Sequence, residues 1–316
     1  MAINTLAMSK KMTEELDKAV VQQAVTGVFA DNGMKAKFVG TKTVLLPDMN
    51  TDGLGDYDRD AGFVQGGVSV GQTTYELTMD RGRTFQIDRM DNDEVAVANL
   101  AGQVSGEFVR TKVVPEVDAY VLSKLAAQAT TKSHTVTVGT GSTLETDAYK
   151  MWQTALLGLQ EATGFDDTQL IAFVNPTFWS ALNRSTAFTR QILVSDFAKG
   201  GVTTQVKTVD GVAILPVVPS RMKSAFTFYD GKTDTSSTDS GVNQKPGGFV
   251  PTSTAKNVGL LLCSRKVGSL VKKTEKVRFF NPDQNLTADA YKIDYRLYYD
   301  FFIKKSAADQ VYAYTY

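Results

Sequence analysis

The chain has little of the chemistry that most catalytic and metal-binding sites require. Its 316 residues include one cysteine, Cys263, and one histidine, His134. A single cysteine excludes a disulfide within the chain and argues against a thiolate zinc site, and a single histidine excludes a histidine cluster. We expect Cys263, in an apolar run, to be a small buried side chain. We expect His134, in a polar stretch, to lie at the surface or in a turn.

The sequence also lacks an excess of either charge. Lysine and arginine number 34, aspartate and glutamate also number 34, and the formal net charge is zero. A protein that grips nucleic acid over a broad face normally carries a basic excess, because it must neutralise phosphates. Long apolar runs of the roughly 20 residues that span a bilayer are missing, as is a secretory signal. We therefore expect no membrane partner and a cytoplasm-like compartment.

The order of the predicted elements favours an α+β chain. Apolar periodicity predicts helices over residues 13–30, over 91–129 with an interruption or kink at Pro115, over 147–163 and over 176–183. Apolar runs and alternation predict strands within 37–46, 73–87, 169–174, 212–218, 258–263, 267–280 and 291–303. The last strand has the clearest alternation, which assigns Asp300 to its polar face.

A long polar segment separates the first two predicted strands. It contains residues 50–60 (NTDGLGDYDRD), which are rich in glycine and aspartate and too poor in apolar residues to build a core. Connections of this length inside a compact domain are uncommon and are usually functional or disordered. The flanking strands predict a projecting two-stranded arm, and an isolated hairpin is only marginally stable. We expect another subunit to pack against it.

Charged residues at the two ends of this arm are candidates for contacts between subunits. The tip holds Asp52, Asp56, Asp58 and Arg59, and the base holds Arg81 and Arg83. Because a guanidinium pairs geometrically with a carboxylate, the aspartates of one copy can meet the arginines of the next, as a closed ring requires. The alternative is a solvated turn with scattered charges.

Two segments imitate catalytic or metal-binding motifs. Residues 67–71 (GVSVG) match a nucleophile elbow at Ser69, but a strand-like segment follows where the motif needs a helix, and His134 is the only available base. Residues 56–60 imitate the first half of a calcium loop, yet Ala61 and Gly67 stand where that loop needs glycine and glutamate. We expect no enzyme, no cofactor and no high-affinity metal site. Weak binding of divalent cations to the aspartates stays open.

Three blocks of sequence stand in a characteristic order: residues 55–59 (GDYDR), 75–93 (YELTMDRGRTFQIDRMDND) and 292–300 (KIDYRLYYD). This order resembles the major capsid proteins of tailed bacteriophages, which have the Hong Kong 97 fold. The resemblance covers most of the chain and contains no catalytic motif. It implies an N-terminal arm over 1–34, an extended β-hairpin loop over 35–88, a spine helix and peripheral domain over 89–130, an axial domain over 131–255, and return strands of the peripheral domain over 256–316.

The resemblance also implies partners. Members of the family self-assemble as pentamers and hexamers into an icosahedral virion head, in the bacterial cytoplasm, around double-stranded DNA that they do not bind sequence-specifically. Some carry a long N-terminal scaffolding region. Here the predicted arm begins almost at Met1, so we expect either a separate scaffold protein or prior removal of that region, together with a portal protein. An encapsulin-like nanocompartment shell resembles the same fold, and a serine hydrolase using Ser69 and His134 is the other alternative.

The predicted arm also lacks the side chain that some family members use to crosslink neighbouring subunits. That side chain is a lysine in the extended loop, and this chain has no lysine between Lys42 and Lys112. We therefore predict that mature shells separate on a denaturing gel into chains of the monomer mass, 34.4 kDa. A ladder of bands above that mass would contradict this prediction.

Overall fold

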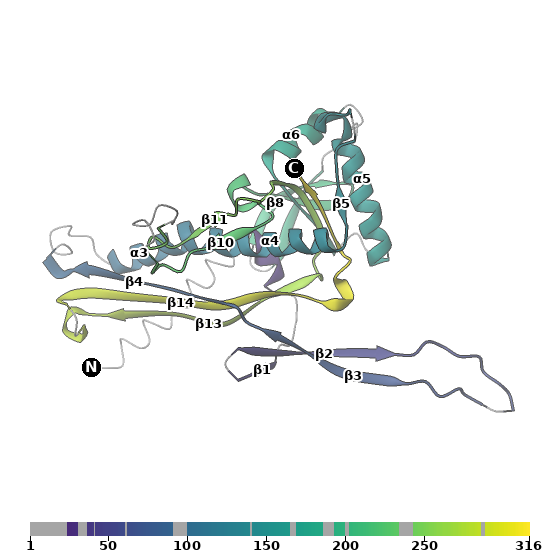
Figure 1. The fold of residues 1–316 in the computed structure, drawn as a ribbon, viewed down its shortest axis with the longest axis horizontal. Coiled ribbons are helices and arrows are strands. Elements are labelled where there is room, and N and C mark those ends of the chain that lie inside the picture. The colour runs from purple at the N-terminus through teal and green to yellow at the C-terminus, as the bar shows by residue number, and fades with distance from the viewer. Residues whose placement is uncertain are drawn as a thin grey trace.

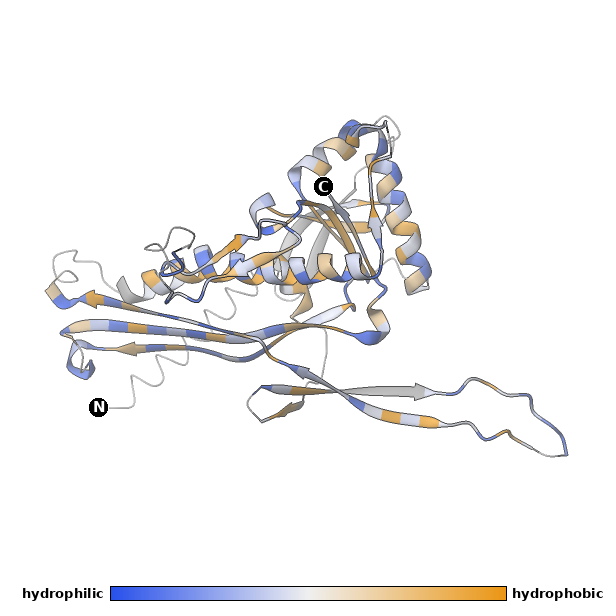
Figure 2. Ribbon diagram, viewed as in Figure 1, coloured by the Kyte–Doolittle hydropathy of each residue, from blue (hydrophilic) through white to orange (hydrophobic). Residues whose placement is uncertain are grey.

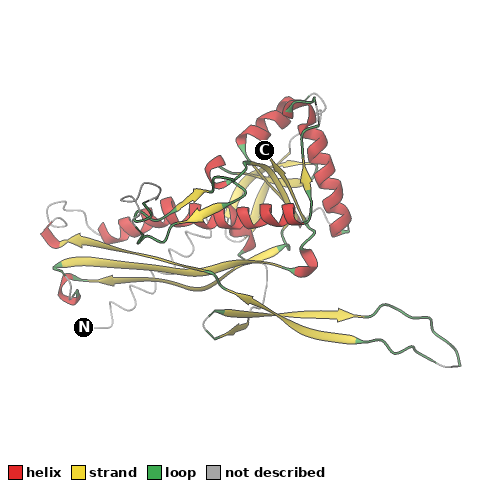
Figure 3. Ribbon diagram, in the orientation of Figure 1, coloured by secondary structure: helices red, strands yellow, loops and turns green. Residues whose placement is uncertain are grey.

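The computed structural model describes residues 24–30, 37–40, 42–60, 62–90, 100–139, 141–164, 169–185, 193–199, 202–233, 243–285 and 288–316. These residues form an elongated body from which a two-stranded arm projects (Figure 1). Helices and sheets alternate through the body (Figure 3), so the expected α+β class is confirmed.

The largest sheet in the described chain has seven strands, in the order β5-β15-β12-β6-β9-β8-β7. Their bounds are β5 Thr135–Val136, β6 Leu170–Val174, β7 Leu193–Lys199, β8 Val202–Val209, β9 Val212–Pro216, β12 Val258–Ser264 and β15 Val311–Thr315. β6 runs parallel to β9 and β15 parallel to β5, whereas the other neighbours are antiparallel. The strands predicted over 169–174, 212–218 and 258–263 are therefore confirmed.

Helices cover both faces of this sheet, which explains why β6 (LIAFV) and β12 (VGLLLCS) are almost continuously apolar. Side chains alternate between two buried clusters: Ile171 and Phe173 belong to one, Leu170 and Ala172 to the other. The second cluster includes α5 (Leu144–Thr163) and α6 (Pro176–Arg184). The end of α5 at Gly164 is confirmed, since this glycine adopts the left-handed conformation with φ 68°.

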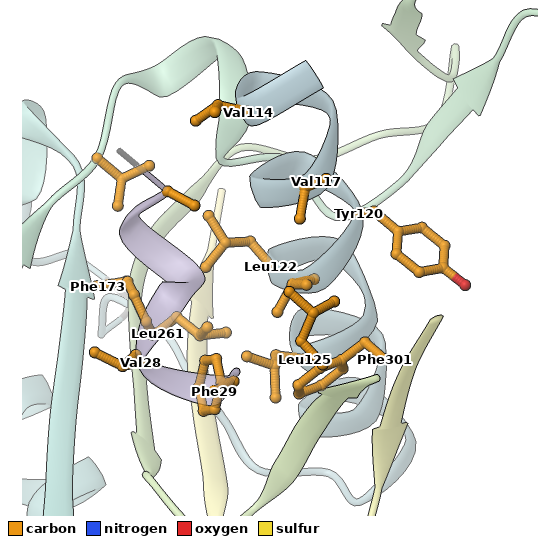
Figure 4. Packing of buried hydrophobic residues seen from close by; sticks show 14 of the residues in the cluster. Val28, Phe29, Val114, Val117, Tyr120, Leu122, Leu125, Phe173, Leu261 and Phe301 are labelled. Atoms are coloured by element: carbon orange, nitrogen blue, oxygen red, sulfur yellow. The ribbon is translucent and has the colours of Figure 1, made fainter. Parts of the chain in front are cut away.

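The first cluster lies between the large sheet, a long helix and a second sheet. The helix is α4 (Val114–Thr131), and the second sheet has the order β13-β14-β4, with β4 Met79–Asp88, β13 Gly268–Phe280 and β14 Ala290–Ile303. Figure 4 shows Leu122 and Leu125 of α4 beside Phe29, Leu261 and Phe301. The hydropathy of β14 is coloured in Figure 2; its burial alternates from Ile293 to Leu297, whereas Leu297 to Phe302 are all buried, so the predicted alternation holds for only part of the strand.

The interruption expected at Pro115 takes the form of a π-helical segment. α3 (Leu100–Phe108) continues through the π-helical residues Val109–Val113 directly into α4, where Pro115 lies in the first turn. Proline is tolerated there because it has no N–H to donate, and the wider turn before it absorbs the change in spacing. Residues 91–99 of the predicted helix lie outside the described residues.

The N-terminal segment differs from its prediction. Residues 13–23 lie outside the described residues, and Val25–Phe29 form a 3₁₀ helix, η1, whose Thr26, Val28 and Phe29 are buried. The carboxylate of Asp118 in α4 accepts hydrogen bonds from the N–H and hydroxyl of Thr26, at 3.0 and 2.7 Å, and from Arg221 at 3.1 Å. Burial raises the pKa of Asp118, and these donors oppose the rise. This part of the expected arm is therefore core.

Each of two segments that were predicted as one strand contains parts of two strands. Residues 37–46 contain β1 (Lys37–Val39) and the first part of β2 (Thr43–Thr51), because Gly40 turns the chain at φ 67°. Residues 73–87 contain part of β3 (Val68–Glu76) and most of β4, separated at Leu77 and Thr78. No strand was predicted for β5, β7, β8, β15 or the two-stranded sheet of β10 (Phe226–Phe228) and β11 (Phe249–Pro251).

The boundary expected at 255/256 does not separate the two large sheets. β12 and β15 follow it in the sequence, yet β12 pairs with β6, and β15 pairs with β12 and β5. Only β13 and β14 of this last part join β4. The reason is that β12 fills the position between β6 and β15, which closes the apolar core on both faces of the sheet.

Candidate assembly surface

The arm is a regular hairpin that projects beyond the body (Figure 1). β2 and β3 pair in antiparallel register from Thr43 opposite Glu76 to Thr51 opposite Val68. Past the last pair, Asp52 accepts a hydrogen bond from the N–H of Gly67 at 2.6 Å, which holds the start of the tip closed. The arm predicted from the glycine- and aspartate-rich segment is therefore present, and its tip comprises residues 52–67.

The arm exposes an unusual amount of apolar side chain. Of the twelve exposed large hydrophobic residues in the described chain, six lie in the arm and two, Phe38 and Val39, lie in β1, which pairs with β2; the six are Leu54, Tyr57, Phe63, Val64, Val68 and Val70. Phe63 is 89% exposed, and its ring lies 4.9 Å from that of Tyr57. Clustered exposed apolar residues mark an interaction surface, because monomeric proteins rarely leave such patches in water. The sequence analysis emphasised the charges of the tip and missed these residues.

The predicted charged residues of the tip are exposed. Asp58 accepts a hydrogen bond from the N–H of Asp60 at 2.9 Å, within the turn closed by the bridge between Asp58 and Gly62. Asp56 and Arg59 are also exposed, and neither forms an ion pair with another described residue. The tip therefore combines apolar groups with carboxylates that are available to a partner.

The root of the arm, in contrast, is fixed by a buried carboxylate. Asp300 is 1% exposed and accepts hydrogen bonds from the N–H and hydroxyl of Thr78, at 2.9 and 2.8 Å. It also accepts one from Tyr120 at 2.7 Å and one from Lys124 at 2.5 Å, both in α4. Asp300, which the alternation of the sequence groups with the polar side chains of this strand, is therefore buried. β4 begins at Met79, opposite Tyr299, so the next residue of β14 lies beside Thr78 and α4 instead.

An apolar cluster supports the same root. Val44 and Leu77 of the arm contact Val271, Tyr298 and Phe302 of the body in one buried group. The hydroxyl of Tyr298 donates to the carbonyl of Leu77 at 3.2 Å. Each of these contacts restricts the direction in which the arm leaves the body.

The two arginines of the predicted cluster have different roles. Arg81 is held within its own chain: its Nε lies 2.6 Å from Glu116 Oε1, and it donates to the carbonyls of Tyr229 and Gly248. Arg83 is exposed and donates one hydrogen bond, to the carbonyl of Lys245 at 3.0 Å. Of the pair, Arg83 is therefore the one with N–H groups available to another subunit. Its contact with the aspartates of the tip stays a prediction.

The catalytic alternative has no structural support. Ser69 lies inside β3, opposite Asn50, and the strand continues to Glu76, so the strand–turn–helix of a nucleophile elbow is contradicted. His134 follows the turn after α4, half-buried, with its ring stacked 4.4 Å from that of Tyr312. Cys263 is fully buried, as expected, and burial raises the pKa of its thiol.

The described residues contain no group of three or more histidine, cysteine, aspartate or glutamate side chains arranged to hold a metal ion. In the same part of the chain, no helix is sufficiently long and apolar to cross a membrane.

The fold is similar to those of chains in solved phage structures. A chain from the capsid of cyanophage P-SCSP1u gives a TM-score of 0.56 at 13% identity, over 88% of this chain and 84% of that one. A chain from the mature capsid of bacteriophage PhiM1 gives 0.55 at 12% identity, over 90% and 86%. A chain of Mycobacterium phage Che8 gives 0.52 at 13% identity, over 89% and 92%.

Sequence comparison adds no closer relative, since no family model and no curated protein matches this chain. Identities of 12–13% establish the fold alone. The chain therefore has an α+β capsid fold, and its individual contacts must be argued from its own residues.

We predict that Asp300→Ala destabilises the protein by on the order of 3 kcal/mol, because Lys124 and the other donors lose a buried acceptor. The midpoint of urea unfolding, followed by circular dichroism, measures the change. Asp294→Ala is the matched control on the same strand: its carboxylate is 30% exposed and bonded to Thr84. Equal midpoints for the two variants would contradict the role assigned to Asp300.

Proposed function

We propose that this chain is the major capsid protein of a tailed bacteriophage. In this proposal, it assembles as pentamers and hexamers into the icosahedral head of the virion, in the host cytoplasm, around double-stranded DNA. The observation that carries the proposal is the apolar arm on a molecule with a capsid fold. The apolar side chains of the arm are exposed in a single copy. A shell buries them by placing another copy against each arm.

The energetics of the arm favour association. Burying one leucine or phenylalanine side chain contributes about 1.5–3 kcal/mol, so burial of Leu54, Phe63 and Val64 together offsets a substantial part of the entropy lost when two copies meet. Each copy in a ring both gives and receives such a contact. The stabilisation therefore repeats around every capsomer.

The geometry of the arm favours a closed ring. The tip lies far from the α3 end of the body in Figure 1, so a tip that binds a neighbour joins two different surfaces. Head-to-tail contacts of this kind close into rings when the rotation between copies allows, and otherwise form open filaments. Pentamers and hexamers are two closed solutions of one such contact.

The charge of the protein is consistent with a container for DNA. Its formal net charge is zero, whereas tight binding to phosphates demands clustered cations. In our proposal the shell encloses DNA without sequence-specific binding, and a scaffold and a portal protein direct its assembly. We further propose that β13, β14, β4 and α4 form the peripheral domain and that the seven-stranded sheet forms the axial domain. β12 and β15 then belong to the axial part.

We predict that the double substitution Leu54→Ser and Phe63→Ser prevents particle formation while the subunit stays folded, because both side chains project from the arm into solvent. Electron microscopy and light scattering of the purified protein, expressed with its scaffold where one is needed, measure assembly. Circular dichroism measures folding. Leu157→Ser, on α5 at 54% exposure, is the matched control and should assemble.

Two results would decide against the proposal. Particles with unchanged yield and shape from the arm variant would show that the arm does not mediate assembly. Particles that enclose protein cargo and no DNA when isolated from their natural source would indicate a nanocompartment instead.

A further inference from the structure

The body also contains a pocket. Its volume is about 550 Å³, within the range of sites that bind small groups. It lies between β4, β14, the π-helical segment and the chain that joins β10 to β11. Three aromatic rings form one wall: Phe85 and Phe108 lie 4.9 Å apart, edge to face, and Phe108 and Tyr295 lie 5.6 Å apart.

One residue that lines the pocket has a buried polar group without a partner. Tyr299 lines it and is 1% exposed, yet its hydroxyl has no hydrogen-bond partner among the described residues. A buried hydroxyl left in this state costs free energy, because it has lost water and gained nothing in return. A ligand that brings a hydroxyl or amide group to this position recovers that cost.

The charges available at the pocket are positive. Each lining carboxylate already has a partner: Glu116 binds Arg81, Asp80 binds Arg296, and Asp230 accepts hydrogen bonds from its own turn. Arg83 and Lys112 also line the pocket, are exposed, and form no ion pair with the described residues. A ligand with acidic groups at the mouth of the pocket therefore finds cations there.

These three features define a ligand: an aromatic ring that carries a hydrogen-bonding group and is flanked by acids. The arm tip contains this combination as Asp56, Tyr57 and Asp58, with Tyr57 60% exposed. We propose that the pocket binds Tyr57 of a second copy, with its hydroxyl at Tyr299 and the flanking carboxylates at Arg83 and Lys112. This inference rests on the assembly function proposed above, and it specifies one contact within it.

The occupant must come from another copy. In Figure 1 the arm leaves the body on the side opposite to α3, β10 and β11, so the tip of a chain lies far from its own pocket. The pocket thus supplies a receptor for the head-to-tail contact. It also changes the partner first expected for the aspartates of the tip, because Lys112 takes the place of Arg81, which Glu116 already holds.

Removal of single hydroxyl groups tests the inner end of the site. We expect Tyr57→Phe and Tyr299→Phe each to raise the protein concentration needed for assembly at least about five-fold, the effect of one hydrogen bond. The double variant should be no worse than either single one, since both remove the same bond. Tyr291→Phe, on the same strand but outside the pocket, is the control and should have no effect. Independent, multiplicative effects of the two substitutions would overturn the assignment.

Disulfide trapping in assembled shells tests the contact directly. Asp58→Cys combined with Lys112→Cys should, after mild oxidation, give bands above the monomer mass on a non-reducing gel, and the native Cys263 is buried and does not compete. Asp58→Cys with Lys150→Cys, an exposed position on α5, should give monomer only. Shells that form normally but yield monomer for both pairs would overturn this inference and leave the proposed function intact. A complete failure of the unmodified chain to form shells would overturn both.

Discussion

A single buried carboxylate, that of Asp300, joins the arm, α4 and β14, the parts on which the proposed assembly depends. It accepts hydrogen bonds from Thr78 at the root of the arm and from Tyr120 and Lys124 in α4, and it belongs to β14 itself. A charge removed from water is tolerated only while its partners stay in place, so the arrangement of arm, helix and sheet is set as one unit. The direction in which the arm leaves the body follows from this constraint, and in the proposed assembly it sets where the arm meets a neighbouring copy.

Apolar side chains are buried at the root of the arm and in the body, whereas those at the tip are exposed. The clusters around Leu261 and Leu262 close both faces of the large sheet, and Val44 and Leu77 close the joint with the arm. Beyond that joint the arm has regular backbone pairing but leaves Phe63 and its apolar neighbours in water. A rigid base with an unburied tip is the expected design of a subunit whose core is completed by copies of itself. The similarity of the fold to phage capsid chains agrees with this physical argument and does not replace it.

The sequence predicted those elements whose environment is reflected in local periodicity. β6, β12, β14 and α5 were found because each has one dominant pattern, and Gly164 marks the end of α5 through its backbone conformation. The sequence did not predict what depends on distant partners. Alternation grouped Asp300 with the polar side chains of β14, and its burial was not predicted because the start of β4 and the position of Thr78 are not visible in the sequence of β14. Arg81 was assigned to a neighbouring subunit because its partner, Glu116, lies 35 residues away in the sequence. The charges of the tip are visible in the sequence. The exposure of its apolar side chains is visible only in the fold, where no described residue covers them.

Hydrogen exchange of the arm backbone, compared between unassembled subunits and purified particles, measures whether a neighbouring copy packs against the arm. We predict that amides of β2, β3 and the tip exchange rapidly in the free subunit, because one copy offers the distal arm no packing. In the particle they should become protected, whereas amides of β6 and β12, buried in both states, should change little. Arm amides that exchange equally fast in the two states would contradict the claim that a neighbouring copy completes the arm.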